Sequence, residues 1–385
     1  MDFDWTDEQK ELRRGAVEFA AGTLVDGMIE RDRDETFSRT LWRACADFGL
    51  QGLLAPEEWG GAGQDLLTAV AVFEGIGYGA HDGGLVFSVA AHAASCEGPL
   101  GGFGSAAQKA EWLPRLADGS AIGATGITEP DSGSNALGGT MTARRDGEGP
   151  EAGWILDGSK TFVTNAPVAD LFIVYARTGG KGFAGLSCFL VPRETEGLTI
   201  GPAMDKMGLR TSPIAQIYLD DCRLPADAVL GEVGSGAMIF SQTMDVERLL
   251  VMAPALGAME RLLERCVAHA RQRDTGSGPL GRHQAVSHAI ADMETRLESA
   301  RWLLYRAAWK KMHRGNATRE SALAKLVTSE AYVACCRSAL QLFGGYGYMV
   351  DYEIEREMRD ALATTIYVGT SEIQKNLIAG LRGLR

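Results

Sequence analysis

The stretch MIFSQTMDVERLLVMAPALGAMERLLERC, from Met238 to Cys266, predicts one long helix with Glu247 near its centre. The residues three and four positions from Glu247 on a helix are Thr243, Met244, Leu250 and Val251. Three of these four are apolar, so we expect a raised pKa for the Glu247 carboxyl. Such a carboxylate suits a general base that removes a proton from a weak carbon acid. For this stretch alone, an ion pair with Arg248 or a neighbouring helix is the simpler interpretation.

The composition is that of an ordinary globular protein, with 385 residues of which 45% are hydrophobic and 23% charged. A net charge of −12 argues against nucleic acid and membrane surfaces as partners. The seven cysteines form no C-x-x-C pair and no Cys/His cluster, so we expect core cysteines and no metal site. The acidic N-terminus is unlike a signal peptide, and no apolar run approaches the roughly 20 residues that cross a bilayer. The sequence therefore predicts a cytoplasmic protein.

Three parts of different texture predict an α+β protein with several domains. Residues 1–120 show helical patterns, beginning with the capping residue Thr6. Residues 121–232 contain closely spaced β-type runs, with Asp157-Gly158 as a hairpin signal, and predict an antiparallel β domain. Residues 233–385 contain long helical stretches with short loops and predict a four-helix-bundle-like domain. Its expected helices are Met238–Arg273, Arg282–His313, Asn316–Phe343, Asp351–Leu362 and Ser371–Leu381.

Two motifs in the β part carry small and hydroxyl residues. GITEPDSGSN, from Gly126 to Asn135, combines flexible backbone with hydroxyls that can bond the edge of a flat heteroaromatic ligand, although a surface loop has the same composition. DGSKTFVTNAP, from Asp157 to Pro167, places Phe162 and Thr164 on one face of a strand. That pair can cover a ring and bond its rim, or Phe162 can belong to the core.

Two further motifs lie in the second helical part. LFGGYGYM, from Leu342 to Met349, has glycines whose N–H groups could cradle an anion, or that simply end a helix. IYVGTSEIQKNL, from Ile366 to Leu377, has Thr370 at a helix start that could hold a phosphate or a ribose hydroxyl. No G-x-G-x-x-G follows a strand, so a Rossmann site is not supported.

In this order and spacing, the chain resembles the acyl-CoA dehydrogenase family of flavoproteins over nearly its whole length. The resemblance rests on ITEPDSGSN, KTFVTN, MGLRTSP with LDDCRLPADAVLG, QLFGGYGY and YVGTSEIQ. It implies bound FAD and the removal of two hydrogens from an acyl thioester, with a base taking the α-proton and flavin N5 taking a β-hydride. It also implies a homotetramer built from dimers and an electron-transfer-flavoprotein-like acceptor.

The resemblance also assigns residues to the site. The implied FAD contacts are Ile127, Thr128, Ser134, Phe162, Thr164, Arg273, Gln341, Gly345, Thr370 and Glu372, of which Arg273, Gln341 and Gly345 would serve a neighbouring subunit's FAD. The implied substrate contacts are Val368, Arg248, Met244 and Tyr367. The backbone N–H of Val368 would bond the thioester oxygen.

The chain departs from the family pattern at two positions. Many members carry the base directly before the Gly-Thr of the last motif, where this chain has Val368. The isovaleryl and long-chain branches carry it instead on the preceding long helix, at a position that Glu247 matches, so the resemblance makes Glu247 the catalytic base. The second departure is Gly276, where the family usually has an aromatic residue that stacks on the adenine side.

Several alternatives remain open from the sequence. The acyl group can be carried by CoA, which we prefer, or by a carrier protein, as in relatives that act on aminoacyl groups such as prolyl. A flavin monooxygenase or oxidase of the same fold is disfavoured by Glu247, and a non-catalytic scaffold is disfavoured by the retained site residues. Bulky Met238, Phe240, Met244 and the Tyr346–Tyr348 segment favour a short or branched acyl group, unless they are ordinary core.

Overall fold

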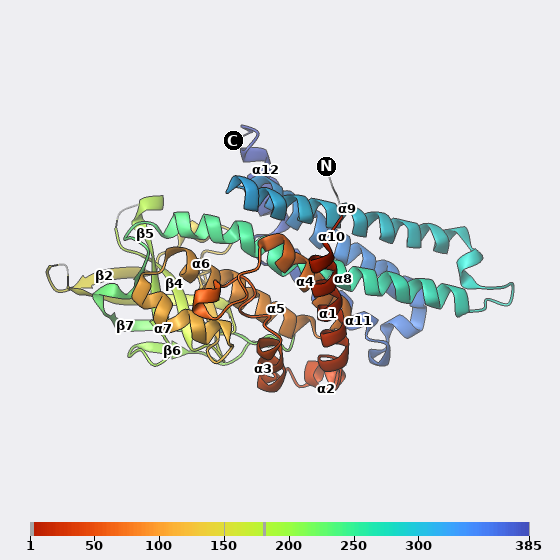
Figure 1. The fold of residues 1–385 in the computed structure, drawn as a ribbon, viewed down its shortest axis with the longest axis horizontal. Coiled ribbons are helices and arrows are strands. Elements are labelled where there is room, and N and C mark those ends of the chain that lie inside the picture. Colours follow the sequence, from red (N-terminus) through yellow and green to blue (C-terminus); the bar gives the residue numbers. More distant parts are fainter. Residues whose placement is uncertain (1–3, 150, 180–181, 385) are drawn as a thin grey trace.

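The computed structural model describes residues 4–149, 151–179 and 182–384, and consists of helical, β and again helical parts (Figure 1). The first helices are α1 (Asp7–Thr23), α2 (Met28–Arg33), α3 (Arg39–Asp47), α4 (Leu66–Gly79), α5 (Gly83–Ala91), α6 (Gly98–Phe103) and α7 (Ala106–Ala117). The Thr6 hydroxyl accepts a hydrogen bond from the Gln9 N–H, which confirms Thr6 as the first cap. A π-helical turn, His92–Glu97, joins α5 to α6.

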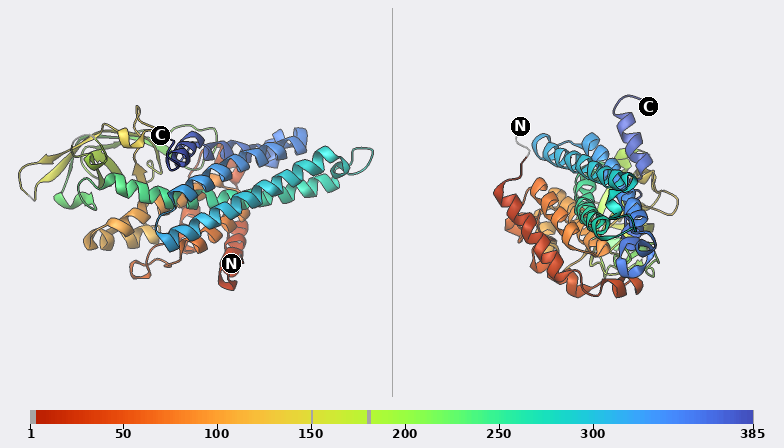
Figure 2. Two further views of the ribbon diagram at one scale, coloured as in Figure 1. Left: turned by 90° about the horizontal axis from the view of Figure 1, so that it is seen from above. Right: turned by 90° about the vertical axis from the view of Figure 1, so that its right-hand side faces the viewer.

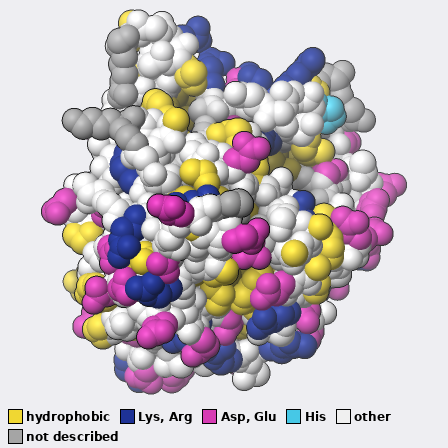
Figure 3. Space-filling model, turned by 90° about the vertical axis from the view of Figure 1, so that its left-hand side faces the viewer, with side chains coloured by type: hydrophobic (Ala, Val, Ile, Leu, Met, Phe, Trp, Pro, Cys, Tyr) yellow, Lys and Arg dark blue, Asp and Glu magenta, His cyan; other side chains and the backbone are white. Residues whose placement is uncertain are grey.

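The middle part is a single sheet with the order β6-β7-β3-β2-β4-β5-β8 and with β1 beside β4. Its strands are β1 (Gly123–Gly126), β2 (Thr142–Asp146), β3 (Gly153–Thr164), β4 (Leu171–Arg177), β5 (Leu186–Pro192), β6 (Leu198–Ile200), β7 (Ile214–Leu224) and β8 (Val229–Leu230). Most pairs are antiparallel, as predicted, but β4 runs parallel to β1 and to the first residue of β2. Because β4 joins them from farther along the chain, local turn signals do not encode these pairs. Acidic and basic side chains are interspersed on the face at this end (Figure 3).

The predicted hairpin at Asp157-Gly158 is wrong, because β3 continues through both residues. Gly158 has a φ of 142° and lies at a register shift opposite β7. A Cβ at Gly158 would lie 2.9 Å from the Met141 side chain. The glycine therefore serves a bulge and a close approach of two strands rather than a turn.

The second helical part contains the long helix α8 (Gly236–Gln272), which crosses the molecule (Figure 2). The other helices are α9 (Gln284–Arg314), α10 (Thr318–Phe343), α11 (Ile354–Thr364) and α12 (Ser371–Gly380). Glycines bring α4 and α8 close together, since a Cβ at Gly77 would lie 2.0 Å from the Pro254 carbonyl oxygen. One buried cluster includes Phe73, Val163 and Leu256, so residues of all three parts share a core. The observed architecture confirms the predicted fold class, while the boundaries at 120 and 232 stay predictions.

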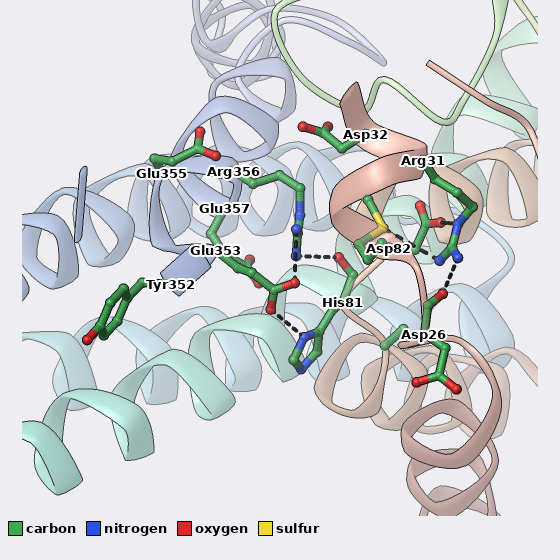
Figure 4. A network of polar contacts seen from close by, with 12 residues as sticks. Asp26, Arg31, Asp32, His81, Asp82, Tyr352, Glu353, Glu355, Arg356 and Glu357 are labelled. Carbon is green, nitrogen blue, oxygen red and sulfur yellow. Dashed lines mark hydrogen bonds and ion pairs between the residues drawn. The ribbon is translucent and has the colours of Figure 1, made fainter. Parts of the chain in front are cut away.

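A polar network fixes α11 against the first helical part (Figure 4). His81 Nδ1 lies 2.8 Å from Glu353 Oε2, and Arg356 donates to Glu353 at 3.2 Å and to the His81 carbonyl at 3.1 Å. Although burial opposes it, the bond with His81 and the charge of Arg356 lower the pKa of Glu353 to about 2. This anchoring holds the segment after α11, which contains Tyr367 and Val368.

The described ranges contain neither a membrane-spanning helix nor a cluster of metal-binding side chains. None of their helices has the length and apolarity needed to cross a membrane. No three His, Cys, Asp or Glu side chains in these ranges gather as a metal site would require. The seven cysteines are buried and unpaired, which confirms them as core residues.

Candidate active site

Glu247 lies on α8 in largely apolar surroundings. Leu250 and Val251 are buried and Met244 is half-buried. Burial raises the pKa of Glu247 to about 7, although the nearby Arg248 lowers it, and the predicted direction is confirmed. Its Oε2 is buried and has no hydrogen-bond partner in the described part of the chain. A carboxyl with this pKa can accept a proton near neutral pH.

The expected ion pair of Glu247 is not formed. Arg248 Nε instead donates to the carbonyl oxygen of Val368 at 3.4 Å, and its Nη1 lies 3.8 Å from Asp245 Oδ1. Asp245 is itself held by the Thr318 hydroxyl at 3.1 Å. Across residues 4–149, 151–179 and 182–384, Glu247 makes no salt bridge, so the simpler interpretation is wrong. A buried carboxylate without a cation is a costly arrangement, and such groups are concentrated at functional sites.

Val368 has a strained backbone, with a φ of 49° in the left-handed region that β-branched residues avoid. Its carbonyl oxygen accepts hydrogen bonds from Arg248 Nε at 3.4 Å and from Gln374 Nε2 at 3.1 Å. Its N–H donates to no group in the described ranges. The structure thus brings position 368 against α8 at Arg248, the neighbour of Glu247 in sequence, with a backbone donor left free.

Tyr367 lies in an aromatic pair beside α8. Its ring lies 4.6 Å from the ring of Phe87 on α5, at 31° to it. Both rings, Val251 and Asp360 line a closed cavity of about 50 Å³. Burial raises the pKa of Asp360 to about 7. Because Val251 is one helical turn beyond Glu247, this aromatic pair lies about one turn along α8 from the Glu247 carboxyl.

The loop after β1 is held by the buried ion pair between Glu129 and Lys160, which the sequence motifs did not predict. Glu129 Oε1 accepts hydrogen bonds from Lys160 Nζ at 2.7 Å and from the Met141 N–H at 3.0 Å. The Thr128 carbonyl accepts from the Thr161 N–H at 2.9 Å. The alternation of buried and exposed side chains along a strand could have indicated this ion pair, because it turns the Lys160 side chain of β3 inward. These bonds fix the backbone that carries Ile127 and Thr128, while Ser134 farther along the loop is exposed.

Phe162 is the clearest ligand-contact candidate of the β part. Its side chain is 64% exposed, and its φ of 54° lies in the left-handed region at the second register shift of β3. A large exposed aromatic held in a strained backbone indicates a binding surface rather than core. Thr164 ends the same strand half-buried. A flat ring on Phe162 would have the Thr164 hydroxyl near its rim.

Arg273 and Gly345 share an open pocket of about 500 Å³ with Tyr346, whose ring lies 5.8 Å from the Arg273 guanidinium. Gln341 lines a neighbouring groove. At about 1.5 Å per helical residue, roughly 39 Å of α8 separate Glu247 from Arg273. The structure therefore does not bring these residues to Glu247 within one chain.

Two expectations change at this end of the molecule. Tyr346 lies beside Arg273, far along α8 from Glu247, and so cannot shorten an acyl pocket at Glu247 of the same chain. Tyr348 lines a separate groove with Arg33 and Met207. Gly276 has a φ of 83° and its N–H donates to Asp274 Oδ1 at 2.7 Å, so the loop has a backbone suited to glycine. Position 276, where the family usually has an aromatic residue, is therefore part of a tight turn in this chain.

The last predicted motif begins α12. The Thr370 hydroxyl accepts a hydrogen bond from the Ile373 N–H at 3.3 Å, which confirms the cap. Glu372 is exposed, and its own backbone N–H and the Thr370 hydroxyl lower its pKa. Ser371 donates to Glu330 at 2.6 Å, which ties this helix start to α10.

Family models identify the class of protein. The acyl-CoA dehydrogenase N-terminal domain matches residues 6–120, the middle domain residues 124–222 and the C-terminal domain residues 234–380. The chain belongs to the acyl-CoA dehydrogenase family of oxidoreductases, which act on CH–CH bonds. This confirms the family assigned from the motifs.

Relatives of two kinds are similar to the chain. The L-prolyl-[peptidyl-carrier protein] dehydrogenase of Pseudomonas fluorescens is 40% identical over 98% of this chain and 99% of its own length. The mitochondrial short-chain specific acyl-CoA dehydrogenase of Mus musculus is 39% identical over 96% of this chain and 88% of its own length.

Solved structures show the same division. The prolyl acyl carrier protein oxidase AnaB has a TM-score of 0.96 at 39% identity, covering 99% of this chain and 100% of its own. The structure of PigA with FAD and proline has a TM-score of 0.97 at 35% identity. Butyryl-CoA dehydrogenase from Megasphaera elsdenii has a TM-score of 0.94 at 36% identity. Both comparisons cover 100% of each chain.

Proposed function

We propose that this chain is an FAD-dependent dehydrogenase that converts a short or branched acyl thioester, such as an acyl-CoA, into its 2-enoyl thioester with Glu247 as the base. The observation that carries this proposal is the unpaired Glu247 carboxyl, with a pKa of about 7, beside a position 368 that has no carboxylate. Bound FAD supplies the acceptor of the β-hydride at N5. Glu247 removes the α-proton, and Arg248 stays engaged with the Val368 carbonyl.

The free N–H of Val368 supports the same chemistry. An α-proton becomes acidic when hydrogen bonds stabilise the enolate oxygen as it forms. Arg248 and Gln374 hold the Val368 carbonyl from one side, and the N–H donates to no described group. This donor can bond the thioester oxygen, which explains the retained strain at a β-branched residue.

FAD fits the residues that the sequence assigned to it. The exposed Phe162 offers a surface for the isoalloxazine ring, with Ile127, Thr128 and Thr164 around it. Ser134 is exposed for the phosphates, and Thr370 with Glu372 lies at the N-terminal end of α12. A solved complex of similar PigA contains FAD, which supports the same cofactor in this chain.

The distance along α8 supports a neighbouring subunit as the source of the remaining FAD contacts. Arg273, Gln341 and Gly345 lie too far from Glu247 to serve the same cofactor within one chain. Apolar Trp302 and Trp309 are exposed along α9. Both features support a homotetramer built from dimers, which light scattering of the purified protein would test.

A carrier-bound aminoacyl group, such as prolyl, is the second candidate substrate. This candidate is supported by the similarity to the prolyl carrier-protein dehydrogenase and to AnaB. Their sequence identity to this chain, 40% and 39%, is as high as the 39% of the short-chain acyl-CoA dehydrogenase. An electron-transfer flavoprotein is the proposed acceptor, as the family resemblance implies; a solved structure described as an electron transferring flavoprotein includes a chain that is 35% identical over 100% of this chain. The cytoplasmic location stays a prediction.

Anaerobic reduction of the bound flavin tests the proposed function. The holoenzyme is mixed with butyryl-CoA, isobutyryl-CoA and carrier-bound acyl and prolyl thioesters, and the loss of the yellow flavin absorbance is followed. Bleaching with formation of the enoyl product supports dehydrogenation. Failure of every thioester, with FAD bound, would favour a monooxygenase or a non-catalytic scaffold.

A further inference from the structure

Three buried polar atoms near the proposed base have no hydrogen-bond partner in the described ranges. They are Tyr175 Oη, Thr243 Oγ1 and Glu247 Oε2. Tyr175 is 1% exposed and Thr243 is 7% exposed, so solvent does not satisfy their hydroxyls. Burying a polar group without a partner destabilises the fold, so several of them at one place indicate a polar occupant.

The three groups face one another across α8 and β4. Phe240, Thr243 and Glu247 lie three and four residues apart and share one stripe of α8. The Tyr175 ring on β4 lies 6.0 Å from the Phe240 ring, edge to face. Burial raises the pKa of Tyr175; the Cys188 thiol and the Glu247 carboxyl also raise it, and contact with the Thr243 hydroxyl lowers it, so the Tyr175 hydroxyl lies close to these three side chains.

This space adjoins the proposed flavin site. Gly126 on β1 pairs with Val174 on β4, so Ile127 lies next to Tyr175. The Ile127 side chain packs against the buried cluster that contains Tyr175. The hydroxyls therefore lie between a residue assigned to the flavin and the residue assigned to the α-proton.

The charges around this space favour a hydrogen-bond donor as the occupant. Arg248 is engaged with Val368 and Asp245, and Lys160 with Glu129 and the Ile127 carbonyl. Cys188 beside Tyr175 is an uncharged thiol, since burial raises its pKa to about 12. An ionised Glu247 only accepts hydrogen bonds, and a hydroxyl accepts as readily as it donates. The complementary atom is an amine nitrogen.

We propose that Tyr175 and Thr243 form a subsite for an amino nitrogen on the carbon next to the thioester, which makes the substrate an aminoacyl thioester. This inference rests on the proposed function and narrows it to the second of its substrate classes. With a purely aliphatic acyl group, the two hydroxyls would have only each other, the Cys188 thiol and the Glu247 carboxyl as polar neighbours among the described residues. A site built for hydrogen bonds rejects such an analogue more strongly than an apolar site rejects an extra methylene.

The test compares prolyl and cyclopentanecarbonyl thioesters of pantetheine, which differ by one ring N–H in place of CH₂. Anaerobic flavin reduction is measured with FAD-loaded wild type, Tyr175→Phe, Thr243→Val and the control Tyr218→Phe, whose side chain is 43% exposed on β7. We expect wild type and the control to reduce flavin at least about tenfold faster with the prolyl thioester. Each subsite variant should lower the ratio of the two rates by about tenfold.

The outcomes separate the subsite from the proposed function. If wild type uses both thioesters equally, or if the subsite variants lower both rates in proportion, the subsite is refuted while the dehydrogenase stands. If no thioester, including butyryl-CoA, reduces the wild-type flavin, the proposed function fails and the subsite fails with it. Absorbance of bound FAD and thermal unfolding of each variant exclude loss of the fold as the cause.

Discussion

Arg248 donates a hydrogen bond from Nε to the carbonyl oxygen of Val368 at 3.4 Å, and so joins the two positions at which this family can carry its base. Because the guanidinium is used in this way, the adjacent Glu247 is left without a cation. Its carboxyl therefore keeps a pKa of about 7 rather than the low value of an ion-paired acid. One hydrogen bond thus orders the backbone at 368 and leaves the Glu247 carboxyl without an ion-pair partner in the described part of the chain.

Glu247→Gln should retain bound FAD and lose flavin reduction by substrate. The amide keeps the size of the side chain but accepts no proton, so we expect the anaerobic bleaching rate to fall by about 10²–10⁴-fold. Glu264→Gln, an exposed position on the same helix, is the matched control and should keep the wild-type rate. A Glu247→Gln variant that bleaches as fast as wild type would remove Glu247 from the base role.

The rate of flavin reduction should rise with pH through about 7. Glu247 must be ionised to accept the α-proton, and its pKa is about 7. Below that pH the rate should fall about tenfold per unit, and above it the rate should level off. Stopped-flow bleaching between pH 5.5 and 9 measures the profile at saturating substrate. A midpoint near the ordinary value of 4.5 would contradict the buried, unpaired carboxyl.

Glu247→Gln should also stabilise the protein at alkaline pH. The folded pKa of Glu247 is above its ordinary value of 4.5, so folding favours the protonated form, and this stability is lost as pH rises through 7. A shift from 4.5 to about 7 corresponds to about 3 kcal/mol in the free energy of unfolding. Thermal unfolding of the FAD-loaded proteins should show equal stability near pH 4.5 and a more stable variant at pH 8.

Long helices, the cap at Thr6 and the raised pKa of Glu247 could be predicted because they depend on neighbours in sequence. Parallel pairing of β1 with β4 could not, because it joins strands that no local signal connects. The bulge at Gly158 looked like a turn because both use a glycine with positive φ.

Within the site, the motifs named residues but could not give their contacts. Arg248 was an ion-pair candidate for Glu247 until the structure showed its hydrogen bond to residue 368, which lies 120 positions later. The sequence does not single out Tyr175, because a tyrosine within a hydrophobic strand is typical of a core residue. Only the three-dimensional arrangement shows that its hydroxyl is unpaired beside Thr243 and Glu247.

Val368→Glu should restore part of the activity that Glu247→Ala loses. The backbone at 368 adjoins α8 through Arg248, so a carboxylate on this residue can reach the space next to position 247. We expect the double variant to bleach flavin at least about tenfold faster than Glu247→Ala alone, as a positioned base contributes at least that much. Val368→Gln in the same background controls for size and should give no recovery. Equal rates for the two double variants would show that the positions do not face one carbon.

Phe87→Ala should shift the substrate range toward longer acyl chains. The rings of Phe87 and Tyr367 lie 4.6 Å apart and line, together with Val251, a cavity of about 50 Å³ beside α8, one helical turn from Glu247. Removing the Phe87 ring enlarges this cavity, while short chains lose apolar contact worth about 0.8 kcal/mol per buried CH₂. Flavin reduction by a series of straight-chain acyl-CoA thioesters should therefore show a longer optimum in the variant. Phe183→Ala, at a 72% exposed phenylalanine of the β part, should leave the optimum in place. An unchanged optimum in Phe87→Ala would mean that the acyl chain runs in another direction from Glu247.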